Sequence, residues 1–364
     1  MIFTFSPLWF YICFSWALSL IPFAFFFPSH QFLYSLSFFI FCILVLPFPG
    51  ADIFHSYIPL FNGDYYFSTE PLFKFLVDKN ILLGGNYISF YFFIILFSLP
   101  VIYRSFQILY SGNSSYKASL SFGIFCLISG PVIFYHSPRS ALPFTLLFAS
   151  LALSNNSKVK SSLCALLAPW LHIQALPYTF IVLIYNLFST KKVFKNLFSS
   201  PRLLLISTFL LAILLFLFVS PLTSALSIVS PDLSLRASIK LHYIESSSGL
   251  RISSLFTFLA VLLSTFSFKF LPRFYSFRNI LSVFPLLRLF LFFAFSIQLI
   301  FFTNPHISSR LSRPADYIIL PILLASLLPS NFSKHVPFYS VLLLFMSLLI
   351  TFIYPSVFFN FPST

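Results

Sequence analysis

Acidic side chains are scarce in this chain of 364 residues, which has 7 Asp and Glu against 21 Lys and Arg. Charged residues of both signs make up 8 % of the sequence, whereas a soluble domain has roughly a quarter. With 59 % hydrophobic residues as well, the composition excludes the soluble globular class. The net charge of +14 is explained by cytoplasmic loops that retain Lys and Arg, and no nucleic-acid-binding motif accompanies it.

Glycine and cysteine are also few. The 8 Gly form no phosphate-binding loop, which argues against a nucleotide site and an ATP-driven pump. The 4 Cys lie inside apolar runs without metal-site or disulfide spacing, so we expect them to be small core residues. No His and carboxylate spacing predicts a metal site, and no cofactor is expected.

Long apolar runs predict an all-α, polytopic transmembrane protein that forms a single integral membrane domain over 1–364. Helices are expected because a barrel requires an alternating pattern that the sequence lacks. The first run has no basic residues before it, so we expect a transmembrane helix there rather than a cleaved signal peptide. About twelve spans are predicted: 3–27, 31–49, 87–107, 118–135, 141–154, 161–175, 177–189, 203–222, 252–270, 281–302, 317–329 and 336–355.

Two features depart from a simple row of membrane-spanning helices: a pair of short spans and an arginine inside a span. The sixth and seventh are short, and they form either two crossings or one re-entrant hairpin. Arg288 lies within the tenth span, close enough to its inner end for the side chain to extend to the membrane surface.

The distribution of charge predicts which side each loop occupies. If the loop 50–86 is outside, all 7 carboxylates of the chain fall outside, and the inside segments hold most Lys and Arg. We therefore predict an N-out, C-out topology. The large outer loops follow the second span (50–86) and the eighth (222–251), and a third outer loop covers 303–316.

The outer loop 50–86 combines acids with aromatic residues, a mixture that suits sugar binding, because rings stack on pyranoses and carboxylates bind hydroxyls. Within it, Pro71 is expected to begin a short interfacial helix capped by Ser68 or Thr69. The residues of interest in this loop are Asp52, Tyr57, Asp64, Glu70 and Asp78.

Basic groups stand at the outer ends of other spans: Arg139 with His136, His172, and Arg310 with Arg313. Ionisable groups at membrane depth are candidate sites, and arginine forks match the oxygens of a diphosphate. No predicted span contains a carboxylate, which argues against proton-coupled transport.

Four segments occur in an order that resembles the EpsG-type polysaccharide polymerases, relatives of the Wzy-type O-antigen polymerases. The segments are GADIFHSYIPLF followed by EPLF, HSPRSALPF, WLHIQALP and SSRLSRPADYIILP. Their order and placement match the family over about residues 1–330, most clearly over 50–185. The chain departs from the family pattern at Leu72, Ser140 and Gln174.

The resemblance implies a glycosyltransferase-type enzyme in the bacterial cytoplasmic membrane, acting in exopolysaccharide, capsule or O-antigen synthesis. It would polymerise repeat units carried on polyprenyl diphosphate at the outer face. Expected partners are that lipid-linked oligosaccharide, membrane lipids, a flippase and a chain-length regulator. The family pattern nominates Asp52, Glu70 or His172 as catalytic and Tyr57, Arg139 and Arg310 as substrate-binding, and position adds Asp64 and Arg313.

Three alternatives remain at this point. A transferase using a polyprenyl-phosphate sugar usually has its acidic pair after the first span, whereas here the acids follow the second. A lipid-linked oligosaccharide flippase predicts arginines inside the spans, where this chain has Arg288 alone. A non-catalytic subunit of a synthesis complex is the third.

Overall fold

A computed structural model describes parts of the chain between residues 58 and 322. The described residues are 58–62, 70–110, 138–189, 200, 202–214, 217, 278–300, 311–315, 317–319, 321 and 322, and scattered positions between 118 and 134. The regular elements among them are all helical. They are α3 (Ile58–Phe61), α4 (Pro71–Leu82), α5 (Tyr87–Leu109), η6 (Pro138–Ser140), α7 (Ala141–Leu153), α8 (Lys158–Leu171), η7 (Ile173–Ala175), α9 (Leu176–Phe188) and α14 (Arg278–Ile300).

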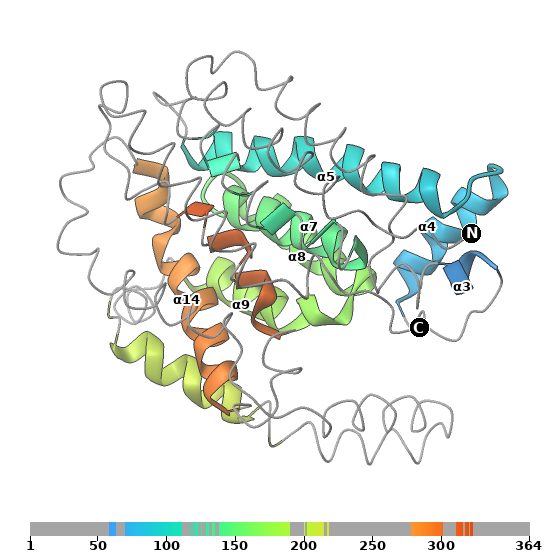
Figure 1. Ribbon diagram of the computed structural model, residues 1–364. Helices are drawn as coiled ribbons and strands as arrows, with labels where there is room; N and C mark the ends of the chain where they lie inside the picture. Colours follow the sequence, from blue (N-terminus) through green and yellow to red (C-terminus); the bar gives the residue numbers. More distant parts are fainter. Residues whose placement is uncertain are drawn as a thin grey trace, which may run out of the picture.

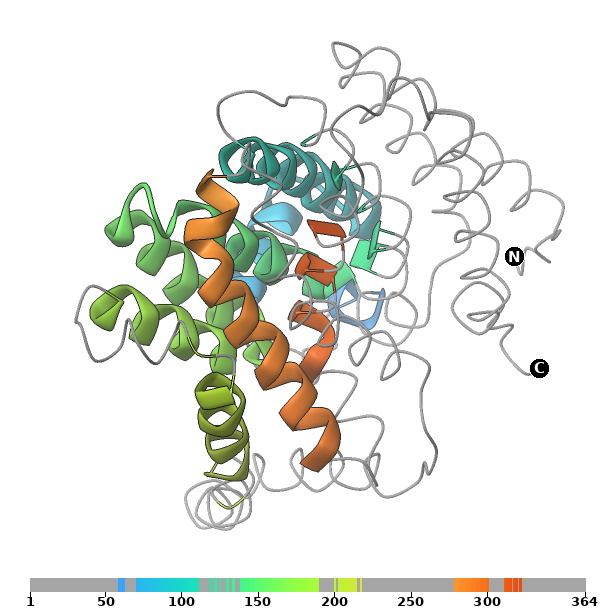
Figure 2. The ribbon, with the colours of Figure 1, turned by 90° about the vertical axis from the view of Figure 1, so that its left-hand side faces the viewer.

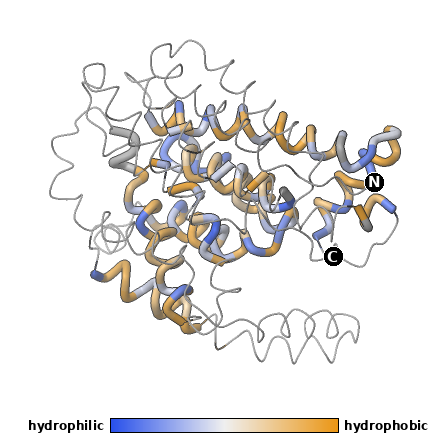
Figure 3. Tube along the Cα trace, in the orientation of Figure 1, coloured by the Kyte–Doolittle hydropathy of each residue, from blue (hydrophilic) through white to orange (hydrophobic). Residues whose placement is uncertain are grey.

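Two of these helices contain stretches that are long and apolar enough to cross a membrane, Ser89–Leu109 in α5 and Val283–Ile300 in α14. Each helix of 23 residues is about 34 Å long, and the hydrocarbon core of a bilayer is about 30 Å thick. Shorter apolar helices cover Ala141–Leu153, Ile173–Phe188 and Arg202–Leu214. Hydrophobic residues predominate along these elements (Figure 3).

The helices α7, α8 and α9 form an up-and-down group around which the other described elements pack. A tight turn joins α7 to α8, where Ser157 caps α8 by accepting a hydrogen bond from the Lys160 amide. At the other end, His172 and η7 turn the chain from α8 into α9. The helix α5 lies alongside α7, and α14 runs across the group (Figures 1 and 2).

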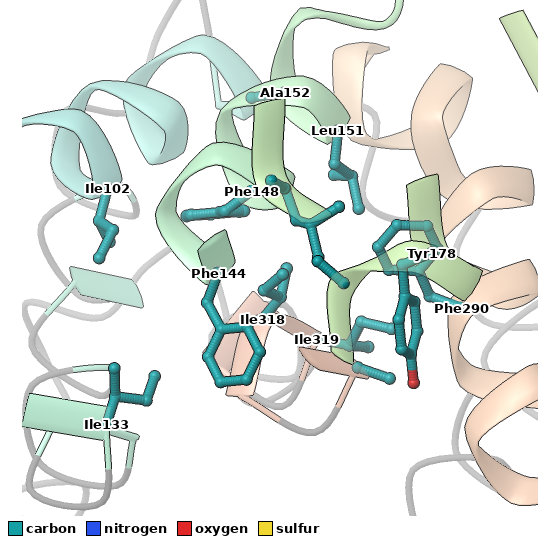
Figure 4. Close-up of a cluster of buried hydrophobic side chains, with 14 of the residues drawn as sticks. Ile102, Ile133, Phe144, Phe148, Leu151, Ala152, Tyr178, Phe290, Ile318 and Ile319 are labelled. Carbon is teal, nitrogen blue, oxygen red and sulfur yellow. The ribbon is translucent and has the colours of Figure 1, made fainter. Parts of the chain in front are cut away.

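The core is centred on α7, where all residues except Leu146 and Leu153 are buried. Phe148 of α7 meets Phe106 of α5 edge-to-face, with ring centroids 4.6 Å apart. Tyr178 of α9 packs in the same way against Phe290 of α14 at 4.9 Å. The close-up in Figure 4 shows Phe148, Tyr178 and Phe290 in this core, with Ile102 of α5 nearby. Edge-to-face pairing adds to the stabilisation that burial of the rings provides.

Polar contacts fasten the end of the group opposite His172. The Asn186 amide donates to the hydroxyl of Ser161 at 2.9 Å, and the Ser161 hydroxyl is 3.2 Å from that of Ser150 on α7. The Lys158 ammonium donates to the Asn186 carbonyl at 2.9 Å, which satisfies a carbonyl at the C-terminal end of α9. Hydrogen bonds between apolar helices fix their register, because the alternative is a buried polar group without a partner.

Helices occupy five of the predicted spans: 87–107, 141–154, 161–175, 177–189 and 281–302. The spans 3–27, 31–49, 252–270 and 336–355 lie outside the described residues, and 118–135, 203–222 and 317–329 are described in part. The prediction for Arg288 is wrong. Its side chain is 1 % exposed, and the guanidinium lies over the Phe284 ring, 4.7 Å from the centroid, rather than extending to a surface.

We expect Phe148→Ala to lower the free energy of unfolding by about 3–5 kcal/mol, because it opens a cavity beside Phe106. Phe180→Ala is the matched control, since Phe180 on α9 is 53 % exposed, and we expect it to cost less than about 1 kcal/mol. Thermal unfolding in detergent, followed by circular dichroism, measures both. Equal losses for the two variants would contradict a core centred on α7.

Candidate active site

A buried acid–histidine pair joins two segments that are 102 residues apart in sequence. Oε1 of Glu70 lies 2.8 Å from Nδ1 of His172. The two residues are 4 % and 6 % exposed. With Glu70 ionised, its carboxylate only accepts hydrogen bonds, so Nδ1 of the imidazole donates, and the basic lone pair of a neutral ring is then on Nε2.

Glu70 owes its position to the start of α4. It is the N-cap residue with an extended backbone (φ −91°, ψ 111°), and its carbonyl accepts the first helical hydrogen bond, from the Lys74 amide at 3.0 Å. Its side chain does not cap the helix, and is directed to His172 instead. Phe73 and Val77, 1 % and 0 % exposed, anchor α4 in the core. The positive N-terminal end of the helix favours a carboxylate at this point.

The predicted helix is confirmed, but its predicted cap is wrong. The sequence favoured Ser68 or Thr69 as the N-cap, and the structure has Glu70. Pro71 is the reason. Proline at the first helical position makes the preceding residue the N-cap and holds that residue in an extended conformation.

His172 is held by its own backbone at the turn between α8 and η7. It has an extended conformation (φ −163°, ψ 124°) and ends α8 as its C-cap residue. Its amide donates to the Ala168 carbonyl at 3.1 Å, and its carbonyl accepts from the Ala175 amide at 3.0 Å. With these two bonds and the Glu70 contact, both the backbone and the ring of His172 have a fixed position.

Two of the predicted arginines lie at the same end of the α7–α9 group as the pair. Arg139 is in η6, directly before α7, and the N-terminus of α7 lies beside the C-terminus of α8 because these helices are antiparallel and joined by a short turn. Arg313 follows Leu311, whose carbonyl accepts a 2.7 Å hydrogen bond from Tyr178 in the first turn of α9. Both arginine side chains are partly buried.

Gln174 provides a further polar atom at this turn. It lies in η7, two residues after His172, and its Oε1 is buried. Among the described residues, no donor reaches this oxygen. A buried acceptor in this state is costly, so a hydroxyl donor from a bound molecule would be stabilised there. The sequence marked Gln174 only as a departure from a family pattern.

The structure therefore brings together Glu70 and His172 in direct contact, with Arg139 and Arg313 at the same end. The remaining predicted site residues lie outside the described part of the chain; they are Asp52, Tyr57, Asp64 and Arg310. Within the part that is described, no group of three or more His, Cys, Asp or Glu side chains could hold a metal ion.

Comparison with known proteins adds no relative, since no family model, curated protein or solved structure matches the chain.

A double-mutant cycle tests the pair itself. We expect Glu70→Ala and His172→Ala each to destabilise the protein by about 3–5 kcal/mol, because each leaves a buried polar partner behind. The double variant should cost less than the sum of the two, with a coupling energy of about 1–3 kcal/mol.

The control cycle combines Glu70→Ala with Trp170→Ala. Trp170 lies two residues before His172 but is 57 % exposed, and we expect coupling below about 0.5 kcal/mol. Additive effects of Glu70→Ala and His172→Ala would contradict the contact.

Proposed function

We propose that the chain is a polymerase of lipid-linked polysaccharide repeat units, which transfers a glycan from polyprenyl diphosphate to an acceptor repeat. The observation that carries the proposal is the buried contact between Glu70 and His172, at the same end of the helices as Arg139 and Arg313. A second support is the ordered resemblance to the EpsG-type polymerases. The family pattern implies Glu70, His172 and Arg139 as site residues, and the predicted topology puts Arg313 on the same outer face.

The proposed base is His172. Glu70 holds the proton on Nδ1 and thereby keeps Nε2 basic, as the carboxylate does in other acid–histidine pairs. Nε2 removes the proton from the acceptor hydroxyl while the hydroxyl oxygen bonds to the anomeric carbon of the donor. The carboxylate also stabilises the imidazolium that results. A positioned base of this kind contributes about 10²–10⁴-fold to the rate.

The arginines are proposed to stabilise the negative charge of the leaving group. As the new glycosidic bond forms, the bond from the anomeric carbon to the diphosphate oxygen breaks, and its electron pair leaves with the polyprenyl diphosphate. In the proposal, the guanidinium groups of Arg139, Arg310 and Arg313 compensate this charge, since arginine forks match the oxygens of a diphosphate. The proton held by His172 is released to solvent at the end of the cycle.

In the full proposal the chain crosses the bacterial cytoplasmic membrane about twelve times with both termini outside. The α5 and α14 helices, long and apolar enough to span a bilayer, support a membrane location. The site faces outward, because every carboxylate of the sequence falls on that side under the predicted orientation. Partners would be the lipid-linked oligosaccharide, a flippase and a chain-length regulator.

The in vivo experiment uses a strain that lacks the chain and is complemented with variants. We expect wild type to restore long polymer, and Glu70→Gln, His172→Gln and Arg139→Ala to leave single lipid-linked repeats at the outer face, with yields lower by about 10²-fold or more. Lys79→Ala on the exposed side of α4 is the control and should behave as wild type. Extraction of lipid-linked glycans with leaflet-selective labelling measures length and location.

The same experiment separates the alternatives. Complete repeats trapped at the inner face would contradict the polymerase and identify a flippase. Repeats that lack one sugar would identify a transferase using a polyprenyl-phosphate sugar. Polymer of normal length from the His172→Gln variant would exclude His172 as the base.

Asp52 and Glu70 itself are the other candidate bases. We expect Asp52→Asn to keep polymer length within about 10-fold of wild type, because His172 is the group with a held tautomer. Loss of polymer in Asp52→Asn, with normal polymer in His172→Gln, would transfer the role to Asp52. The measurement is the length distribution of the glycan on gels.

A further inference from the structure

The α8–α9 pair presents a continuous apolar surface on the side away from α7. Between residues 163 and 187, every exposed side chain is apolar, and these side chains recur every three or four residues on both helices. They are Leu163, Leu166, Leu167, Trp170, Ile173, Leu176, Phe180, Ile184 and Leu187. A soluble protein rarely exposes an apolar area that extends over two helices.

The residues at the two ends of this surface are those that mark the boundaries of a bilayer. Trp170 is 57 % exposed at the His172 end, and tryptophan concentrates at the level of the headgroups. At the other end are Lys160, Asn155 and Asn156, all three exposed. Lysine at this position complements anionic headgroups. We therefore assign the surface to lipid. Contact with a second copy of the chain would not explain why Trp170 lies at one end and Lys160 at the other.

The surface is too short for an ordinary bilayer. α8 has 14 residues and is about 20 Å long, and the apolar helix Ile173–Phe188 is about 24 Å long, so both are about 6–10 Å shorter than the hydrocarbon core. Little further apolar length is available. Polar residues precede α8, the sequence Thr190–Lys191–Lys192 follows α9, and Ile173 is the exposed apolar residue of the turn His172–Ala175. Tilting the helices would shorten their height further.

We propose that the α8–α9 surface contacts lipid acyl chains and that the bilayer is thinned beside it, so that the outer headgroups lie level with Trp170. The Glu70–His172 pair then lies at headgroup depth, where a lipid-linked phosphate also lies, instead of about 6–10 Å below it. This inference rests on the membrane location within the proposed function, and not on the reaction.

Fluorescence of Trp170 tests the depth. The full chain with Trp9→Phe and Trp16→Phe keeps Trp170 as its single tryptophan. It is reconstituted into dioleoylphosphatidylcholine vesicles that carry a nitroxide either near the headgroup or near the chain end. We expect the shallow label to quench more than the deep label. Stronger quenching by the deep label would overturn the thinning, and absence of quenching by both would show that protein covers the surface.

Bilayer thickness tests the same inference on the unmodified chain, in case the double Phe variant does not fold. We expect the thermal midpoint to be highest in dimyristoleoylphosphatidylcholine and about 5–10 °C lower in dierucoylphosphatidylcholine, because a thicker bilayer must be deformed more. A midpoint that is independent of thickness, or highest in the thick bilayer, would overturn it.

Flotation of the vesicles shows whether a negative result contradicts the membrane location or only the bilayer thinning. A chain that does not float with the lipid contradicts the membrane location on which the proposed function also depends. A chain that floats but fails the quenching and thickness tests contradicts this inference alone, and leaves the polymerase to be judged by its product.

Discussion

The contact between Glu70 and His172 is the interaction on which the candidate site depends. Two ionisable side chains are withdrawn from solvent here, and such burial is tolerated only when the groups satisfy each other. The pair therefore requires α4 to stay against α8, and α4 is anchored in the core by the buried Phe73 and Val77, with Phe73 packed against Phe90 of α5. The start of α4 is in this way fixed to a turn that lies 102 residues later in the sequence.

The polar groups are divided between the two ends of the α7–α9 group. One end has Glu70, His172, Arg139 and Arg313, which suit an anionic substrate with hydroxyl groups. The other end has the Ser150–Ser161–Asn186 contacts, which are internal and hold the helices in register. Between them α7 is buried almost throughout, so the site end rests on a packed core rather than on a loop.

Within the part of the chain that the structure describes, several helices lie where the sequence predicted them, because polar breaks set where an apolar helix ends. The predicted span 87–107 became Tyr87–Leu109, and the helix begun by Pro71 was found as well. The side of a helix on which a given side chain lies was harder to predict. Because Arg288 lies near the inner end of the tenth predicted span, its side chain was expected to extend to the membrane surface. In the structure the side chain is buried and lies over the Phe284 ring.

The sequence placed Glu70 and His172 on the same face of the membrane but gave no sign that they touch. Their contact depends on how α4 packs against α8, and nothing local to either residue encodes that packing. The N-cap of α4 is the opposite case, because the local sequence is sufficient to identify it: Pro71 makes the residue before it, Glu70, the N-cap. The prediction of Ser68 or Thr69 gave too much weight to hydroxyl side chains.

The most direct test of the account is a reaction with the purified chain in vesicles, given a synthetic polyprenyl-diphosphate repeat unit as both donor and acceptor. The account predicts a ladder of longer glycans and the release of one polyprenyl diphosphate for each linkage formed, with neither product from the His172→Gln protein. Movement of the intact repeat unit between leaflets, without chain growth or diphosphate release, would contradict it.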